Sequence, residues 1–298
     1  MVYEIRTDLA LESGERIFKE SVEIHGVRVE THENEVEDIK TTTVYIESEN
    51  GSKAMGKPQG TYITIEAPEL LDGDDSYMEQ VADIMGNQMK KMFDFQEDSS
   101  VLAVGLGNQN ITPDALGPWT VERLQITRHL IRTYGKDCLE HGTSCSVSGL
   151  IPGVMATTGM ETLEIIKGVV KETKPDVLLV IDALAARGVK RLGRTIQMTD
   201  AGIHPGSGVG NHRDGITKET LGIPVIGIGV PTVVDAATIV CDAMEHLMDC
   251  LNEEEKDQFV GEMISPQLRC MFVTPKDVDE SVRLLSETIS KGINKTFT

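Results

Sequence analysis

The sequence predicts an α/β protein in which a β-rich N-terminal portion precedes a three-layer α/β/α core. Two observations support this fold class. After residue 98, apolar strand-like runs alternate with amphipathic helical segments, as in sheets covered by helices on both faces. In the first third, runs rich in β-branched and aromatic residues alternate with turns instead. The 298 residues, 40% of them hydrophobic, suffice for a sizeable core.

The N-terminal portion is predicted to hold three strands, at residues 22–30, 41–48 and 61–67. Asn50-Gly51 is a hairpin signal and predicts a tight turn after the second strand. Residues 70–76 (LLDGDDS) are linker-like in composition. We therefore expect a β-rich portion over 9–76 and an α/β core over 77–298, which together form one compact unit.

The α/β portion is predicted from the period of its apolar residues. Methionines and a valine recur at spacings of three and four and indicate a helix over 77–93 whose methionines fill the core. Further helices are predicted at 119–134, 160–173, 235–251 and from Thr274-Pro275 onward. Strands are predicted at 100–107, 176–184, 195–199 and 224–230. The continuous apolar run at 176–184 is typical of a strand buried on both faces.

The charge of the chain argues against two classes of partner. It carries 28 basic and 48 acidic residues, a formal net charge of −20. Residues 1–98 hold 23 acids and 9 bases, a net of −14, which leaves −6 for the other 200 residues. Because nucleic acids and anionic membranes bind basic surfaces, we expect neither as a partner. The absence of a signal segment and of any CxxC pair indicates a cytoplasmic protein.

Several common catalytic motifs are missing from the sequence. It contains no HExxH, no GxSxG and no phosphate-binding GxxxxGK[ST]. Gly105 and Gly107 form a GxG after a predicted strand, but the third glycine of a dinucleotide-binding loop is absent. A nucleotide-binding protein that uses this loop remains an alternative from another functional class.

Two aspartates mark the candidate site. Asp182 follows the apolar run VLLVI, and Asp114 lies in the loop after the strand predicted at 100–107. If these parallel strands are neighbours, both carboxylates emerge at the same edge of the sheet. Such a pair can activate water for attack on an amide or hold a divalent metal. The structural alternatives are a helix cap for Asp114 and an ion pair with Arg187 for Asp182.

Five segments carry a resemblance to a known family. They are GLGNQNITPDALGP (105–118), GLIPGVMATTGMET (149–162), VIDALAAR (180–187), QMTDAGIHPGSGVGNHR (197–213) and GIGVPTVVDAATI (227–239). In this order they resemble the germination proteases of bacterial spores, and the likeness extends over nearly the whole chain. These endopeptidases begin the degradation of small acid-soluble spore proteins during germination. The first loop and the strand leading to Asp182 more distantly resemble hydrogenase maturation proteases, which implies their three-layer core.

The resemblance implies roles for individual residues. The family's two catalytic aspartates fall on Asp114 and Asp182, one as general base on water and the other as acid toward the amide. The family is made as a zymogen that processes itself, and the matching cut lies between Asp8 and Leu9, so that residues 1–8 form the propeptide. Asp8-Leu9-Ala10 matches the family's preference for an acid, a large apolar residue and alanine. A homotetramer in the forespore or spore core is also implied.

An acidic residue before the cut requires a cationic pocket. The segment RGVKRLGR (187–194) has four bases in eight residues, which makes Arg187, Arg191 and Arg194 candidates to bind the substrate carboxylate. Arg213 is a further candidate. A solvated basic face is the alternative interpretation of this segment.

No cofactor is expected, although a divalent metal is not excluded. In a metal-dependent maturation endopeptidase, Asp114 and Asp182 would be joined by His204 or His212 as ligands. Cys145 and His141 raise the possibility of a thiol protease dyad, for which a buried structural thiol is the stronger interpretation.

Overall fold

The computed structural model describes residues 7–13, 24–34, 38–96, 98–136, 145–206, 214–240, 243, 268 and 271–297. Its strands are β1 (Val27–Asn34), β2 (Ile39–Ile46), β3 (Gly60–Glu66), β4 (Ser100–Gly105), β5 (Ser146–Leu150), β6 (Val177–Ala186), β7 (Thr195–Thr199), β8 (Val225–Asp235) and β9 (Phe272–Val273). The helices are α2 (Glu49–Met55), α3 (Asp75–Met92), α4 (Leu116–Glu122), α5 (Arg128–Tyr134), α6 (Met155–Thr158), α7 (Thr162–Thr173), α8 (Lys218–Leu221) and α11 (Val278–Phe297). Short 3-10 turns include η1 (Leu70–Asp72), η2 (Thr112–Asp114) and η4 (Val189–Arg191).

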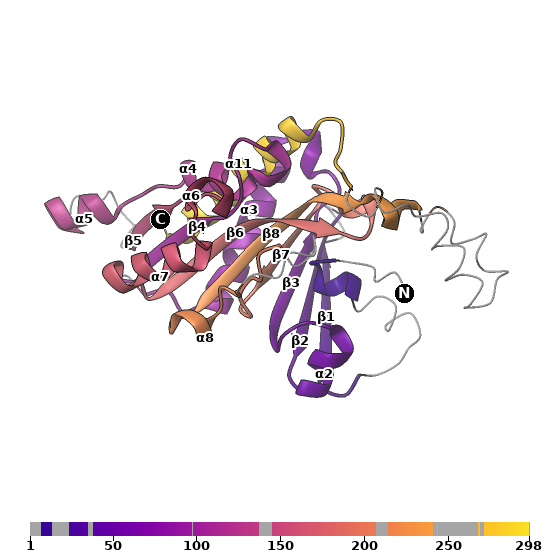
Figure 1. Cartoon of the computed structure of the whole chain (residues 1–298), viewed down its shortest axis with the longest axis horizontal. Coiled ribbons are helices and arrows are strands. Elements are labelled where there is room, and N and C mark those ends of the chain that lie inside the picture. The colour runs from indigo at the N-terminus through magenta and orange to yellow at the C-terminus, as the bar shows by residue number, and fades with distance from the viewer. Residues whose placement is uncertain are drawn as a thin grey trace.

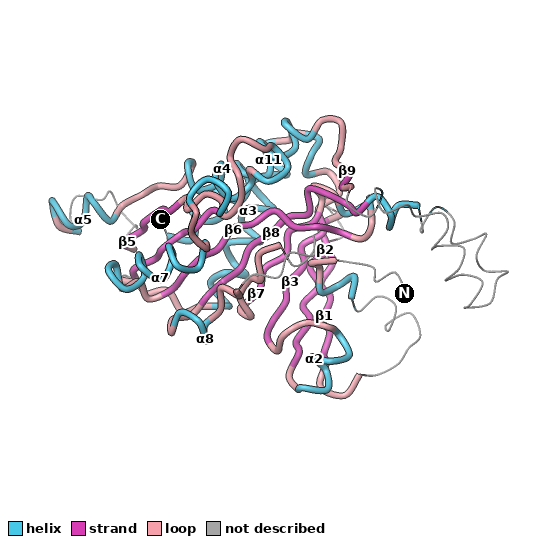
Figure 2. The backbone as a smooth tube through the Cα atoms, in the orientation of Figure 1, coloured by secondary structure: helices cyan, strands magenta, loops and turns pink. Residues whose placement is uncertain are grey.

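The described strands form one mixed sheet in the order β1-β2-β3-β7-β8-β6-β4-β5, with β9 added to β8. Strands β8, β6, β4 and β5 are parallel to one another, whereas β1, β2, β3 and β7 pair antiparallel with their neighbours. Figure 2 shows the strands as a continuous layer from β5 at one end to β1 at the other. Because β3 pairs with β7, the N-terminal strands extend the sheet of the α/β portion.

Helices cover the parallel half of the sheet on both faces, and this confirms the predicted α/β class. Alternate residues of β4 point to opposite sides. Val101 and Ala103 belong to a core cluster shared with α3, α4 and α11, while Leu102 and Val104 pack with residues of α7. Figure 1 shows α3, α4 and α11 on one side of the central strands and α7 on the other. The α3 methionines Met78, Met85 and Met89 are buried in the core, as their spacing predicted.

Two local predictions were wrong, one because of a helix cap and a buried side chain and the other because of a tertiary contact. Asn50-Gly51 lies inside α2 rather than in a hairpin, because the Ser48 hydroxyl caps the helix by accepting from the Gly51 N–H at 3.0 Å and the helix buries Met55. The helix predicted at 119–134 is divided into α4 and α5. Between them Thr127 is bound to β5, where its hydroxyl accepts from the Val147 N–H at 2.9 Å.

Two further predicted segments can be compared with the structure by their burial and bounds. Within the linker-like stretch, Leu70 of η1 is fully buried, whereas residues 72–76 are exposed. Residues 236–240 and 243 are helical, and the remainder of the helix predicted at 235–251 lies outside the described residues. Among the residues that the structure describes, no helix combines the length and apolar character that a membrane crossing needs.

Candidate active site

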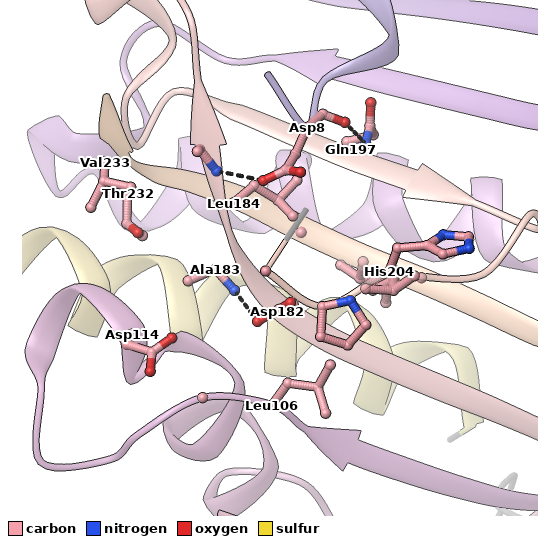
Figure 3. Close-up of a pocket in the computed structure, with 18 of the residues that line it drawn as sticks. Asp8, Leu106, Asp114, Asp182, Ala183, Leu184, Gln197, His204, Thr232 and Val233 are labelled. Atoms are coloured by element: carbon pink, nitrogen blue, oxygen red, sulfur yellow. Dashed lines mark hydrogen bonds between the residues drawn. The ribbon is translucent and has the colours of Figure 1, made fainter. Parts of the chain in front are cut away.

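A cavity of about 620 Å³ lies over β6, β7 and β8 and holds the residues that the sequence singled out. Asp8, Asp114, Asp182 and His204 all line it (Figure 3). Two glycines of β8 also line it, and neither has room for a side chain. A Cβ at Gly227 would lie 2.7 Å from Ile203, and one at Gly229 would lie 2.5 Å from Leu184. The glycines of β8 therefore let the side chains of Ile203 and Leu184 pack directly against this part of the sheet.

Asp182 lies where β6 begins to extend beyond the end of the neighbouring strand β4. Strand β4 ends at Gly105, which pairs with Ile181, so Asp182 is the first residue of β6 beyond that end. The neighbouring parallel strands and their shared edge are as predicted, although β6 continues to Ala186 instead of ending near Asp182. The Asp182 side chain is buried, with only 8% of the residue exposed, and its Oδ1 accepts from the Ala183 N–H at 2.9 Å.

Asp114 is held in η2 by two contacts. Its Oδ2 accepts from the backbone N–H of Asn108 at 2.8 Å. The Thr232 hydroxyl of β8 donates to the carbonyl of Pro113 at 2.7 Å and attaches the turn to the central sheet. Both interactions leave the aspartate on the cavity wall, in the same space as Asp182 (Figure 3).

The glycines of the GxG loop are required by close packing within the chain. Gly107 has φ of +109°, and a Cβ there would meet the Asp114 carbonyl oxygen at 2.0 Å. A Cβ on Gly105 would lie 2.3 Å from the carbonyl oxygen of Gly117 in α4. These contacts explain the glycines without a bound phosphate, and they are what brings Asp114 toward the end of β4.

The N-terminal segment 7–13 lies along β6 next to the cavity. Asp8 donates its backbone N–H to the Ala185 carbonyl at 2.9 Å, and its Oδ2 accepts from the Ala185 N–H at 2.9 Å. Leu9 and Ala10 are completely buried. Leu9 packs in a small cluster with Leu184 and other residues of β6 and β8. The predicted processing site is therefore docked on the strand that carries Asp182.

Two further residues contact the Asp8-Leu9 region, and sequence reasoning did not find them. Lys57 Nζ donates to the Asp8 carbonyl at 3.0 Å and to the Thr7 carbonyl at 3.1 Å. Gln197 Nε2 donates to the same Asp8 carbonyl at 3.2 Å. Burial lowers the pKa of Lys57 below its usual range, although the carboxylates of Asp8 and Glu12 raise it in part. The one signal in the sequence for these two residues was Gln197, a long polar side chain within the fully buried strand β7.

Comparison with known proteins identifies the family. The sequence model of the germination protease family matches residues 4–252. The chain belongs to this family. The germination protease of Caldanaerobacter subterraneus subsp. tengcongensis is 48% identical over 99% of this chain and 94% of its own length. Those of Clostridium perfringens and of a Geobacillus species are 43% and 40% identical, each over 98% of this chain and at least 93% of their own lengths.

Membership of the germination protease family makes the chain an endopeptidase with a role in spore germination. The family assignment agrees with the resemblance carried by the five sequence segments. It also places Asp114 and Asp182 in a peptidase whose cavity contains a segment of its own chain.

The predicted cationic segment of this germination protease binds an acid, and that acid is Glu12. Arg191 Nε lies 3.4 Å from Glu12 Oε1, and the Glu12 carboxylate also accepts the backbone N–H groups of Arg187 at 2.7 Å and Gly188 at 2.9 Å. Arg191 makes a second ion pair with Glu66 at 2.7 Å. The Arg194 side chain is exposed to solvent. Arg213 lies outside the described residues.

The candidate metal ligands of this germination protease do not converge in the part that the structure describes. His204 lines the cavity but is exposed, and His212 lies outside the described residues. Within the described ranges, no three His, Cys, Asp or Glu side chains are placed as a metal-binding group. We derive no step through a metal.

The alternative thiol nucleophile has an unsuitable environment. Cys145 is buried, and its thiol donates to the Gln96 carbonyl at 3.6 Å. Burial raises the pKa of this thiol, whereas a nucleophilic cysteine needs a lowered one. Its proposed partner His141 lies outside the described residues. Cys145 fits the structural role that the sequence favoured.

Proposed function

We propose that this member of the germination protease family cleaves small acid-soluble spore proteins by an aspartic-type mechanism that uses Asp114 and Asp182. The supporting observation is that both carboxylates line one cavity together with Asp8, the residue before the predicted processing cut (Figure 3). A pair of carboxylates beside a docked peptide is the arrangement that general acid and base catalysis on an amide requires.

In this mechanism one aspartate is ionised and the other is protonated. The ionised carboxylate takes a proton from water while the water oxygen attacks the peptide carbonyl carbon. The protonated carboxyl group then gives its proton to the amide nitrogen as the carbon–nitrogen bond breaks. Burial of Asp182, which is 8% exposed, limits access of bulk water and strengthens electrostatic interactions with the reacting atoms.

The same site supports self-processing between Asp8 and Leu9. The intact segment 7–13 occupies the edge of β6 that passes the cavity, through the paired Asp8 and Ala185 hydrogen bonds. A substrate that binds this edge must displace the segment, so the intact chain has the character of a zymogen. Assembly as a tetramer and a location in the forespore or spore core belong to the same proposal.

The test uses purified full-length protein, a small acid-soluble spore protein and the variants Asp114→Asn and Asp182→Asn. We expect either substitution to abolish both substrate cleavage and processing, because the side-chain amide of the introduced asparagine can neither accept nor donate the proton that the aspartate carboxyl group transfers. Asp72→Asn is the matched control, since Asp72 is exposed and is not among the residues lining the cavity. Full activity in both catalytic variants would refute the mechanism, and loss of wild-type activity with a chelator would instead support the metal-dependent alternative.

A further inference from the structure

Gln197 spans the predicted scissile bond with both ends of its amide. Its Nε2 donates to the Asp8 carbonyl at 3.2 Å, and its Oε1 accepts from the Ala10 N–H at 2.7 Å. The peptide bond between Asp8 and Leu9 lies between these two contacts. A buried side-chain amide that makes one hydrogen bond on each side of a peptide bond fixes the position of that bond.

The Asp8 carbonyl oxygen also accepts a charged donor. Lys57 Nζ reaches it at 3.0 Å from the loop that follows α2. The oxygen therefore has one ammonium and one amide donor, from two segments that are far apart in sequence. Paired donors of this kind stabilise negative charge that develops on a carbonyl oxygen during acyl transfer.

The sheet register places Gln197 on the same face as Asp182. Gln197 of β7 pairs with Gly229 of β8, which pairs with Asp182 of β6. Residues in such a row point to the same face, and neighbouring strands are about 4.8 Å apart, so Gln197 and Asp182 face the cavity across roughly 10 Å. The Leu184 side chain packs over Gly229 between them, where a Cβ on Gly229 would lie 2.5 Å from it.

We propose that Lys57 and Gln197 form the site that binds the carbonyl oxygen of the residue before the cut and stabilises the oxyanion of the tetrahedral intermediate. This inference rests on the proposed function. It adds the groups that stabilise the negative charge on the carbonyl oxygen, which the two aspartates do not supply. After self-processing, the same donors bind the corresponding carbonyl of the protein substrate.

Each proton and electron pair can be followed through self-cleavage of the chain between Asp8 and Leu9. The water oxygen bonds to the Asp8 carbonyl carbon, one water proton passes to the ionised carboxylate, and the carbonyl π pair moves onto the oxygen held by Lys57 and Gln197. When this pair returns, the carbon–nitrogen bond breaks, and the Leu9 nitrogen takes a proton from the other carboxyl group. The products are a carboxyl group on Asp8 and an amine on Leu9.

The experiment measures the first-order rate of cleavage between Asp8 and Leu9 in the full chain by intact-mass spectrometry. Lys57→Met removes the ammonium at nearly constant length. Gln197→Glu keeps the oxygen that accepts from Ala10 but replaces the donor to Asp8. We expect each to lower the rate about 100-fold, as for loss of one oxyanion donor. Lys53→Met, at an exposed position of α2, and Gln125→Glu, at an exposed position after α4, are matched controls that keep the wild-type rate.

A pH profile separates charge stabilisation from a structural role. Lys57 faces the carboxylates of Asp8 and Glu12, and its pKa is lowered from 10.5 by burial. Lys57→Arg should retain cleavage, and the ratio of the wild-type rate to the Lys57→Arg rate should fall as the pH rises toward 10.5, because only Lys57 loses its charge. This ratio isolates Lys57, since ionisation of the protonated aspartate lowers both rates alike. Thermal unfolding of every variant verifies that it is folded, and Lys57→Arg remains informative if Lys57→Met is not.

The outcomes distinguish this inference from the proposed function. Cleavage between Asp8 and Leu9 at the wild-type rate in Lys57→Met and Gln197→Glu, together with its loss in Asp114→Asn and Asp182→Asn, would overturn the carbonyl site and leave the aspartic mechanism intact. Absence of any cut between Asp8 and Leu9 in the wild-type chain would overturn both.

Discussion

Gly117→Ala tests whether close packing of α4 positions the loop that carries Asp114. In the structure, a Cβ at Gly117 would lie 2.4 Å from the Leu106 carbonyl oxygen, 2.5 Å from the Ile181 carbonyl oxygen and 2.6 Å from the Leu106 nitrogen. Ordinary contacts of this kind begin at 3.4 Å, so the helix or the strand ends must move by about 1 Å. All three neighbours are backbone atoms, which cannot rotate away.

The expected magnitude follows from two opposing effects. Overpacking of this kind lowers the free energy of unfolding by about 3 kcal/mol. The greater helix propensity of alanine returns about 1 kcal/mol. The net loss of about 2 kcal/mol corresponds to a decrease of about 4 °C or more in the melting temperature. A displacement of about 1 Å near Asp114 should also lower the cleavage rate about 100-fold.

Gly168→Ala is the matched control because it makes the same substitution in another helix. Gly168 lies in α7, and a Cβ there would meet no atom within 4 Å. This variant should be stabilised by about 1 kcal/mol and keep full activity. Calorimetry and cleavage of the spore protein substrate measure both effects. If Gly117→Ala unfolds at or above the wild-type temperature and cleaves normally, the packing argument is wrong.

Three further substitutions test other parts of the structure. Glu12→Gln weakens the charged hydrogen bonds to Arg191 and to the backbone just after β6 by about 2 kcal/mol, so hydrogen exchange of residues 7–13 should accelerate. Unchanged exchange would show that this carboxylate does not hold the segment. Cys145→Ser should keep the wild-type cleavage rate, because the thiol is buried with a raised pKa; loss of activity in a stably folded variant would revive the thiol mechanism. Thr127→Val should lower the free energy of unfolding by about 1–3 kcal/mol, since it removes the acceptor of the buried Val147 N–H; a chemical denaturation midpoint equal to that of the wild type would contradict this role.

The secondary structure was predictable where local and tertiary preferences agree. The methionine spacing of α3 and the apolar run of β6 both correspond to buried elements. Prediction failed at Asn50-Gly51, where the Ser48 cap and burial of Met55 favour a helix over a turn. It also failed at Thr127, whose side chain bonds to a strand about 20 residues away in sequence. At Thr127 a contact outside the local window decided the conformation, and at Asn50-Gly51 a local cap acted together with burial of Met55.

The sequence by itself determined the family and the α/β class, and it placed Asp182 and Asp114 in or after two predicted strands, because each depends on local motifs or on the period of apolar residues. The tertiary structure decided that these two strands, β4 and β6, are neighbours. Only the tertiary structure brought Lys57 and Gln197 to the Asp8 carbonyl, across separations of 49 and 189 residues. It also gave the basic segment a carboxylate partner in Glu12. The physical reason is that a lysine and a glutamine have no local pattern that marks a binding role. Their convergence depends on the pairing of β7 with β8 and on the docking of segment 7–13 along β6.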